Sequence, residues 1–148
     1  MDATEAGIKN AYLQALSSET NDVICGAEFG LENIGKVAII CHALYGGKSS
    51  GAEFWKHLRS CMTNIGFNSY KADTNIWMRE AQKCYGTPFW EHVLLYVDDA
   101  LVISNRREDV IRKDIRKYFY VTDCSIGPLS IYLGKKVSKV TFENGVEA

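Results

Sequence analysis

Apolar runs in this chain are broken by short polar stretches, and the runs predict a set of strands. Residues 37–46, VAIICHALYG, are β-branched and apolar up to a glycine pair, which predicts a buried strand. Residues 75–80, NIWMRE, and residues 91–97, EHVLLYV, read as two more strands separated by the turn-rich AQKCYGTP. Apolar runs flank two aspartates in residues 92–104, HVLLYVDDALVIS, which predicts a tight hairpin.

A helix is predicted over about residues 51–65. Ser50 and Glu53 have the spacing of a capping box, and Gly66 stands where a left-handed residue ends many helices. One apolar stripe at three- and four-residue spacing consists of Trp55, Leu58, Met62 and Ile65.

A second helix is predicted over about residues 106–119, with Asn105 and Glu108 as its capping pair. The apolar positions inside it are Ile111, Ile115 and Tyr118. Its polar side is rich in basic residues, which are Arg106, Arg107, Arg112, Lys113, Arg116 and Lys117. Acidic residues interrupt this set, so a solvated helix face explains it better than a phosphate-binding face does.

The two ends of the chain carry weaker signals. A short segment near Ala6–Ile8 leads into NAYLQAL, which predicts a turn or short helix, and residues 131–137, IYLGKKV, predict a strand before a hairpin-like FENG. Strands and helices alternate without regular βαβ spacing. We therefore expect a single α+β domain over residues 1–148, an antiparallel sheet with helices packed on one face.

Composition excludes several classes of protein. The chain has 148 residues, 47% of them apolar, and a net charge of −1, which supports one core and no strong global attraction to nucleic acid. No apolar run is long enough to span a membrane, and MDATEAGIKN lacks a signal-peptide pattern. Five widely spaced cysteines form no C-x-x-C pair, so we expect a reduced intracellular setting, cytoplasmic or nuclear. The three histidines do not have the spacing of metal ligands.

Asp98 and Asp99 are the strongest candidates for chemistry. Two adjacent like charges at a hairpin are either an ordinary solvated turn or a pair of oxygen donors for a hard cation such as Mg²⁺. Two such ions about 4 Å apart can clamp both oxygens of a phosphoryl transfer. Octahedral coordination also requires a ligand from another segment, so the pair alone leaves both readings open.

The hairpin and four other segments together resemble the reverse transcriptases of copia-type retrotransposons. LLYVDDALVIS resembles their Tyr-x-Asp-Asp hairpin, and IKNAYLQA resembles their first catalytic segment. GKVAIICHALYGGKSSGAEFWKHL, GFNSYKADTNIWMR and IGPLSIYLGKKV resemble further segments of the family. The five segments occur in the family order and span residues 7 to about 137.

The resemblance implies a reverse-transcriptase palm and assigns roles to individual residues. Asp98 and Asp99 would be the catalytic, metal-ligating aspartates of a two-magnesium site. The nucleotide-binding residues would be Tyr12, Tyr45, Gly46 and Lys48, and Tyr132 to Lys135 would lie near the strand that supports the primer. Implied partners are an RNA template, a DNA primer and deoxynucleoside triphosphates. The alternative interpretation, which does not use the resemblance, is that Tyr12 and Tyr45 are core aromatic residues and Lys48 is a solvated charge.

One departure from the family pattern bears on activity. The first motif should begin with aspartate, and Gly7 stands at that position here. Glu5 lies on the same strand face but about 7 Å along the strand, too far to replace a ligand at about 2 Å from Mg²⁺. We therefore expect an incomplete metal site.

The matched segments also cover only part of a polymerase. They correspond to a palm with part of the fingers, and no thumb, RNase H or upstream finger segment is recognisable. We expect an RNA-directed DNA polymerase by ancestry that is inactive as it stands. The alternatives are a non-catalytic module that binds nucleic acid or protein through the palm fold, and a remnant with no selected role.

Overall fold

The computed structural model describes residues 2–138, 140–143 and 145. The chain divides into two compact units. The sheet unit comprises Met1–Lys9 and Met62–Ala148, and the hairpin unit comprises Asn10–Cys61. Within the described ranges, no helix combines the length and the apolar character that a membrane crossing requires.

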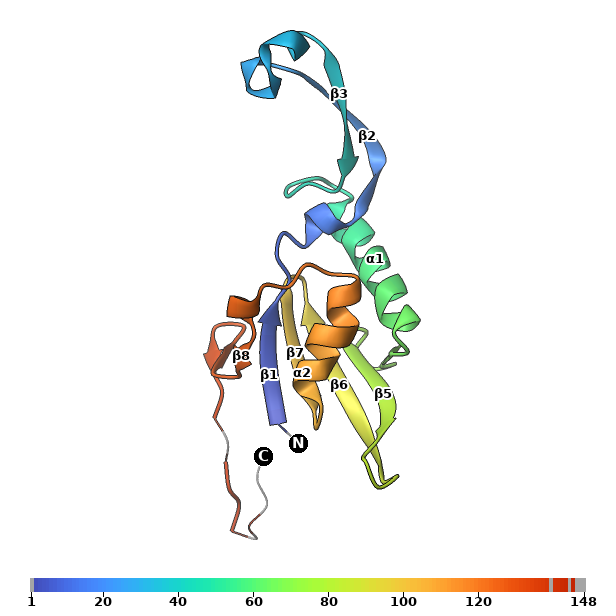
Figure 1. Ribbon diagram of the computed structural model, residues 1–148, viewed down its shortest axis with the longest axis vertical. Coiled ribbons are helices and arrows are strands. Elements are labelled where there is room, and N and C mark those ends of the chain that lie inside the picture. The colour runs from blue at the N-terminus through green and yellow to red at the C-terminus, as the bar shows by residue number, and fades with distance from the viewer. Residues whose placement is uncertain (1, 139, 144, 146–148) are drawn as a thin grey trace. The chain divides into compact units, whose positions relative to one another are not determined.

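Antiparallel strands form the framework of the sheet unit (Figure 1). Over the described residues they make a six-stranded sheet in the order β4-β5-β6-β7-β1-β8. The bounds of these strands are β1 Asp2–Gly7, β4 Asn68–Ser69, β5 Ile76–Gln82, β6 Pro88–Tyr96, β7 Asp99–Ser104 and β8 Gly127–Pro128. A separate ribbon pairs β9, Ile131–Tyr132, with β10, Lys135–Lys136.

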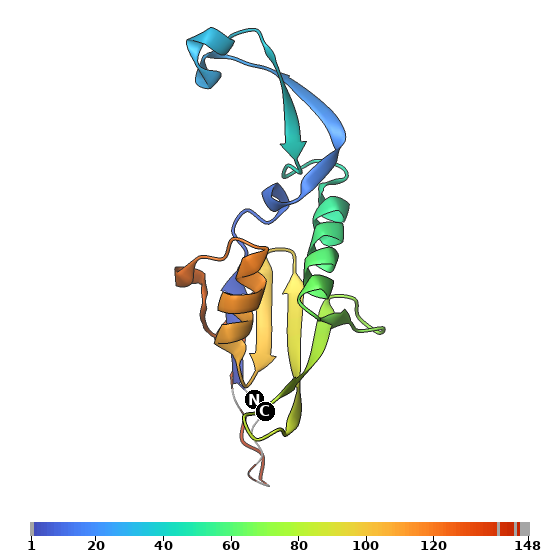
Figure 2. The ribbon, with the colours of Figure 1, turned by 45° about the vertical axis from the view of Figure 1, so that its right-hand side comes forward.

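One continuous helical segment covers one face of this sheet (Figures 1 and 2). It begins as α2, Arg107–Asp109, continues as a π-helical turn over Val110–Asp114 and ends as a 3-10 turn over Ile115–Lys117. Another 3-10 turn, Asp123–Ser125, follows it. Mixed turns change the direction of successive side chains, so the segment keeps a buried apolar side without a uniform 3.6-residue period.

Alternation along the strands separates the two faces of the sheet. The face toward α2 is apolar and buried, and its members include Ala6, Trp77, Val93, Leu95, Ala100 and Val102. From the helical segment and its flanks, Val110, Ile111, Ile115 and Phe119 are also buried. Fully burying one such side chain stabilises the folded state by roughly 1.5–3 kcal/mol, so this layer supplies most of the core of the sheet unit.

A charged cluster is built into the same buried face. Glu91 on β6 is 0% exposed, and its carboxylate accepts hydrogen bonds from Arg79, Arg106 and Ser104 at 2.6–3.1 Å. Arg79 also donates to Asp114 at 2.7 Å, which ties β5 to the helical segment. A buried carboxylate is tolerated only when it is paired and hydrogen-bonded, and Glu91 meets that condition.

The hairpin unit consists of a long ribbon and most of a helix. Antiparallel β2, Leu16–Ile24, and β3, Val37–His42, are paired with a register irregularity between Leu16 and Asn21. Short 3-10 turns occur at Tyr12–Gln14, Ala27–Phe29 and Leu31–Asn33. Helix α1 spans Ser50–Asn64, and the Glu53 carboxylate accepts a hydrogen bond from the Ser18 hydroxyl.

The structure confirms the general α+β class, with antiparallel sheets and few helices. The predicted helix 51–65 corresponds to α1, and the strands predicted in NIWMRE and EHVLLYV correspond to β5 and β6. On α1 the buried stripe contains Phe54 where the sequence pattern placed Trp55, which is partly exposed. The short helix predicted in NAYLQAL is the 3-10 turn at Tyr12–Gln14.

Other predictions were wrong in detail. The strand predicted to be buried within residues 37–46 is β3, whose Val37 and Ile39 are 63% and 64% exposed. The single strand predicted over 131–137 is two short strands, because Leu133 and Gly134 both adopt positive φ and reverse the chain. The predicted FENG feature includes Asn144, which lies outside the described residues.

Candidate functional site

The two aspartates lie at the hairpin turn between β6 and β7. Tyr96 pairs with Asp99, so Val97 and Asp98 form a two-residue loop. Val97 has φ of 53°, a left-handed conformation that β-branched residues rarely adopt and that stores backbone strain. Asp98 therefore lies in the turn and Asp99 is the first residue of β7.

This arrangement corrects the expected facing of the side chains. Simple alternation through the aspartate pair places Tyr96 with Asp98 on one face of the sheet. In the structure Tyr96 and Asp99 are directly opposite each other and share a face, because the loop takes two residues out of the alternation. The two carboxylates thus come from a turn and from a strand.

Residue 7 lies beside this turn. Gly7 pairs with Asp99 across the antiparallel β1 and β7 strands. The Ile8 N–H donates a hydrogen bond to the Asp98 carbonyl oxygen at 2.7 Å, which fixes the end of β1 against the turn. Side chains of directly opposed residues have Cβ atoms about 4.5–5.5 Å apart, so a side chain at position 7 would stand beside the Asp99 carboxylate.

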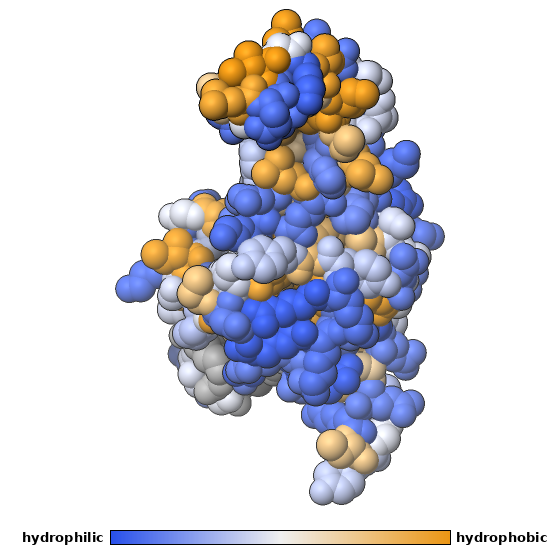
Figure 3. All heavy atoms as spheres, turned by 45° about the horizontal axis from the view of Figure 1, so that its top comes forward, coloured by the Kyte–Doolittle hydropathy of each residue, from blue (hydrophilic) through white to orange (hydrophobic). Residues whose placement is uncertain are grey.

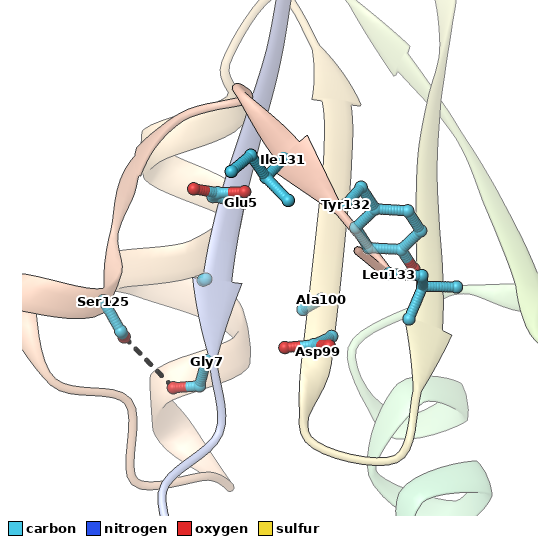
Figure 4. Close-up of a pocket in the computed structure, with 9 residues that line it drawn as sticks. Glu5, Gly7, Asp99, Ala100, Ser125, Ile131, Tyr132 and Leu133 are labelled. Atoms are coloured by element: carbon cyan, nitrogen blue, oxygen red, sulfur yellow. Dashed lines mark hydrogen bonds between the residues drawn. The ribbon is translucent and has the colours of Figure 1, made fainter. Parts of the chain in front are cut away.

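A cavity of about 320 Å³ opens at this place (Figure 4). Glu5, Gly7 and Asp99 line it from the sheet, and residues 131–133 line it from the other side. The Ser125 hydroxyl donates a hydrogen bond to the Gly7 carbonyl oxygen at 3.1 Å. The cavity is bounded by two carboxylates on one sheet face, with no side chain between them at residue 7.

The electrostatics of the cavity follow from these neighbours. Burial, and then the negative charge of Asp98, raise the pKa of the Asp99 carboxyl above its ordinary value. Burial, and then the negative charge of Asp99, raise the pKa of the Tyr132 phenol. Burial is the larger cause of both shifts, and the smaller cause of each is the negative charge of a neighbouring aspartate.

The donor set is nevertheless smaller than a two-cation site requires. Asp98 and Asp99 are both exposed and supply two adjacent carboxylates, while Gly7 supplies none. Among the described side chains, no three His, Cys, Asp or Glu groups gather closely enough to hold one metal ion. Glu5 lines the cavity but sits two residues before Gly7, opposite Leu101 rather than Asp99. The residues present do not fit a complete two-magnesium centre.

The residues expected to bind nucleotide all belong to the hairpin unit. Tyr12 packs against Tyr45 with ring centroids 4.8 Å apart, and against Phe54 at 5.7 Å. Tyr45, Gly46 and Lys48 line a cavity of about 650 Å³ beside β2 and β3. Tyr12 is thus in contact with Tyr45, and Tyr45 lines one cavity together with Gly46 and Lys48. Tyr12 does not line that cavity.

Sequence reasoning missed Ser125, which lines the sheet-unit cavity. Ser125 contacts the Gly7 backbone from the 3-10 turn Asp123–Ser125, and a Cβ atom added at Gly7 would lie 3.4 Å from the Ser125 Cβ. The segment around it, TDCSIGPLS, has no periodicity or motif that marks a site. Only its position in space could have identified it.

None of the family models, curated proteins or solved structures compared with this chain matches it.

Proposed function

We propose that this chain is a palm of the copia-type reverse transcriptases, an RNA-directed DNA polymerase by ancestry that has lost one catalytic carboxylate. The observation that carries the proposal is the pairing of Gly7 with Asp99 across β1 and β7. The family pattern requires its first aspartate to stand beside the Asp-Asp hairpin, and these positions are 92 residues apart in the chain (99 − 7). Unrelated segments that merely resembled the two motifs would have no reason to pair in this register.

Two further observations support the proposal. The antiparallel sheet with a helical segment on one face is the arrangement expected of a palm. The aspartate hairpin also has a strained turn at Val97, and strain of this kind concentrates where a side chain must be held in a set position. Asp98 and Asp99 would be two of the carboxylate ligands of a magnesium site, and the third carboxylate of the family pattern is absent at Gly7.

The same geometry explains why we propose weak or absent activity. Removing one ligand from a two-cation site lowers cation affinity and leaves Asp98 and Asp99 to repel each other. The proposed partners remain an RNA template, a DNA primer and deoxynucleoside triphosphates.

Primer extension tests the proposal directly. The purified chain would be assayed on an RNA template with Mg²⁺ or Mn²⁺ as wild type, Gly7→Asp and Gly7→Asn. We expect extension near background for wild type and Gly7→Asn, and an increase of at least about tenfold for Gly7→Asp, because only aspartate restores the missing ligand. A wild-type rate that Gly7→Asp does not raise would contradict the vacant-ligand explanation.

A binding measurement covers the case in which no variant extends a primer. Titration of Mn²⁺, followed by electron paramagnetic resonance, compares the same three proteins. We expect Gly7→Asp to bind Mn²⁺ at least about tenfold more tightly than Gly7→Asn, and Asp98→Asn to remove the gain. Equal affinity in the Asp and Asn variants would show that residue 7 does not face a cation site.

A further inference from the structure

The ribbon of the hairpin unit leaves one strand edge open. Among the described residues, β3 pairs with β2 and with no other strand. A paired strand satisfies its backbone groups on one side only, so the other side of β3 presents N–H and C=O groups that no other strand pairs. The Ile39 carbonyl oxygen accepts a weak hydrogen bond from the Cys41 thiol at 3.7 Å. Such an edge is a template for another strand.

The hydrogen-bond pattern identifies which backbone groups face the open edge. The Cys25 N–H donates to the Lys36 carbonyl oxygen at 2.8 Å, which makes the neighbouring opposed residues Ile24 and Val37 a non-hydrogen-bonded pair. Hydrogen-bonded and non-hydrogen-bonded pairs alternate along an antiparallel ladder. Val37 and Ile39 therefore direct their N–H and C=O groups away from β2.

Side chains make the β3 edge more receptive than the β2 edge. β3, VAIICH, has no charge, no proline and no register irregularity. β2 carries the charged residues Glu19 and Asp22. The Glu19 N–H donates a hydrogen bond to the Ser17 hydroxyl oxygen at 3.1 Å. Charge and irregularity are the features that protect an edge strand, and β3 has neither.

Apolar side chains extend the surface beside this edge. On the face shared by Val37 and Ile39, Ile24 is 76% exposed. More apolar side chains are exposed on the connection between the strands, and these are Phe29, Leu31 and Ile34. Figure 3 shows apolar residues gathered in this part of the hairpin unit. An exposed apolar patch with an open strand edge is typical of an interaction site.

The charge of the ribbon determines what kind of partner fits. Between Leu16 and His42 there are four acidic residues and one basic residue, which gives a net charge of −3. The acidic residues are Glu19, Asp22, Glu28 and Glu32, and the basic residue is Lys36. A second copy of this chain would bring two acidic ribbons together, whereas a basic partner would be attracted.

We propose that the open edge of β3 binds an extended segment of a partner protein in which apolar and basic residues alternate. The segment adds as a third strand, with main-chain hydrogen bonds to Val37 and Ile39. Its apolar side chains cover the exposed face of the ribbon, and the net negative charge of the ribbon attracts its basic side chains. This interaction goes beyond the proposed polymerase function, because it requires neither a cation nor a nucleic acid.

A labelled peptide tests the proposal on the full chain. The probe is about seven residues long, alternates valine with lysine, and is compared with a valine–glutamate peptide by fluorescence anisotropy. We expect the lysine peptide to bind at least about tenfold more tightly, and to weaken several-fold between about 50 and 300 mM salt. Absence of binding, or equal binding of both peptides, would overturn the proposal.

Two variants separate strand pairing from general apolar adhesion. Ile39→Pro removes an N–H at the open edge without removing a hydrogen bond to β2, and it should weaken the lysine peptide at least about tenfold. Tyr85→Ser removes an exposed aromatic side chain of the sheet unit, outside the ribbon, and it should change the affinity less than about twofold. An equal loss in both variants would assign the binding to non-specific apolar contact and overturn strand addition.

Two further measurements cover the remaining outcomes. If circular dichroism shows that Ile39→Pro does not fold, the wild-type chain is tested with a lysine peptide methylated on alternate backbone nitrogens. An affinity equal to that of the unmethylated lysine peptide would contradict main-chain pairing. Sedimentation of the chain without peptide tests the second copy. A dimer that dissociates in excess lysine peptide would show that another copy occupies the edge, and would overturn the choice of a basic partner.

Discussion

Gly7 and Asp99 are directly opposed residues on neighbouring antiparallel strands, although they are far apart in the sequence. Gly7 does not have a positive φ, and an added Cβ atom would meet Ser125 only at ordinary contact distances of 3.4 and 3.8 Å. The position therefore accepts a Cβ atom without a change in the backbone. The carboxylate is missing because residue 7 is glycine, and the backbone of β1 does not require glycine at this position.

The first prediction concerns the stability of Gly7→Asp. A carboxylate at position 7 stands beside Asp99, and directly opposed like charges are unfavourable by roughly 0.2–1 kcal/mol. Near neutral pH without divalent ions, we expect the free energy of unfolding to fall by about 1 kcal/mol relative to Gly7→Asn. Millimolar Mn²⁺ should recover the lost stability of Gly7→Asp, because a ligand that binds only the folded state stabilises it. Urea denaturation measures both quantities, and a loss that Mn²⁺ leaves unchanged would contradict the prediction.

The second prediction concerns the pKa of Asp99. Burial and the charge of Asp98 both raise it, so Asp98→Asn should lower it toward its ordinary value without restoring it fully. A carboxyl whose pKa is raised on folding favours the folded state at low pH, and this contribution is lost as the pH rises through the folded pKa. Asp98→Asn should therefore reduce the acid-side pH dependence of stability. Carbon NMR of the Asp99 carboxyl checks the shift, with Glu80→Gln as a control that leaves it in place.

The third prediction concerns the turn between β6 and β7. Val97 occupies the first loop position with φ of 53°, where glycine avoids a steric cost of about 1–2 kcal/mol. Glycine also gains freedom in the unfolded chain, worth roughly 0.5–1 kcal/mol, so Val97→Gly should stabilise by up to about 1 kcal/mol. Thermal denaturation measures the change. Gln82→Gly on β5 serves as the control and should destabilise, because that position has no positive φ to relieve.

The fourth prediction concerns the buried charge cluster. Glu91→Gln keeps the size of the side chain but removes the buried carboxylate that pairs with Arg79, which retains Asp114 as its counter-charge. Breaking a buried ion pair costs about 3–5 kcal/mol, and the remaining pair places the expected cost at the low end. We expect a loss of about 3 kcal/mol in the free energy of unfolding, measured by urea denaturation. Glu80→Gln, an exposed neighbour on β5, should change it by less than about 0.5 kcal/mol. Similar losses in both variants would show that the cluster has no special role.

Strong periodic patterns predicted the elements that are buried on one side. The repeat of apolar residues located α1, and the apolar runs located β5 and β6, because burial imposes those periods. β2 was not predicted. Its sequence, LSSETNDVI, is largely polar, and it becomes a strand through pairing with β3. Backbone pairing of that kind leaves little trace in the residue pattern.

In the candidate site, too, some features could be predicted from the residue pattern and others could not. Its two aspartates are visible in the sequence, but the turn was expected at the aspartate pair and instead lies at Val97 and Asp98. No propensity rule assigns a left-handed turn position to valine. The opposition of Gly7 and Asp99 is what the proposed family resemblance implies. Periodicity cannot predict it, because strand order in a sheet is set by long-range packing.

The hydrogen bond from Ile8 to the Asp98 carbonyl has a wider consequence. It joins two main-chain groups, so it forms whatever side chain precedes Ile8 in the chain. The scaffold that would align a catalytic carboxylate is thus independent of whether that carboxylate exists. The geometry around Asp98 and Asp99 is therefore held by the backbone alone, and a substitution at position 7 can change the chemistry of this place without moving the strands that form it.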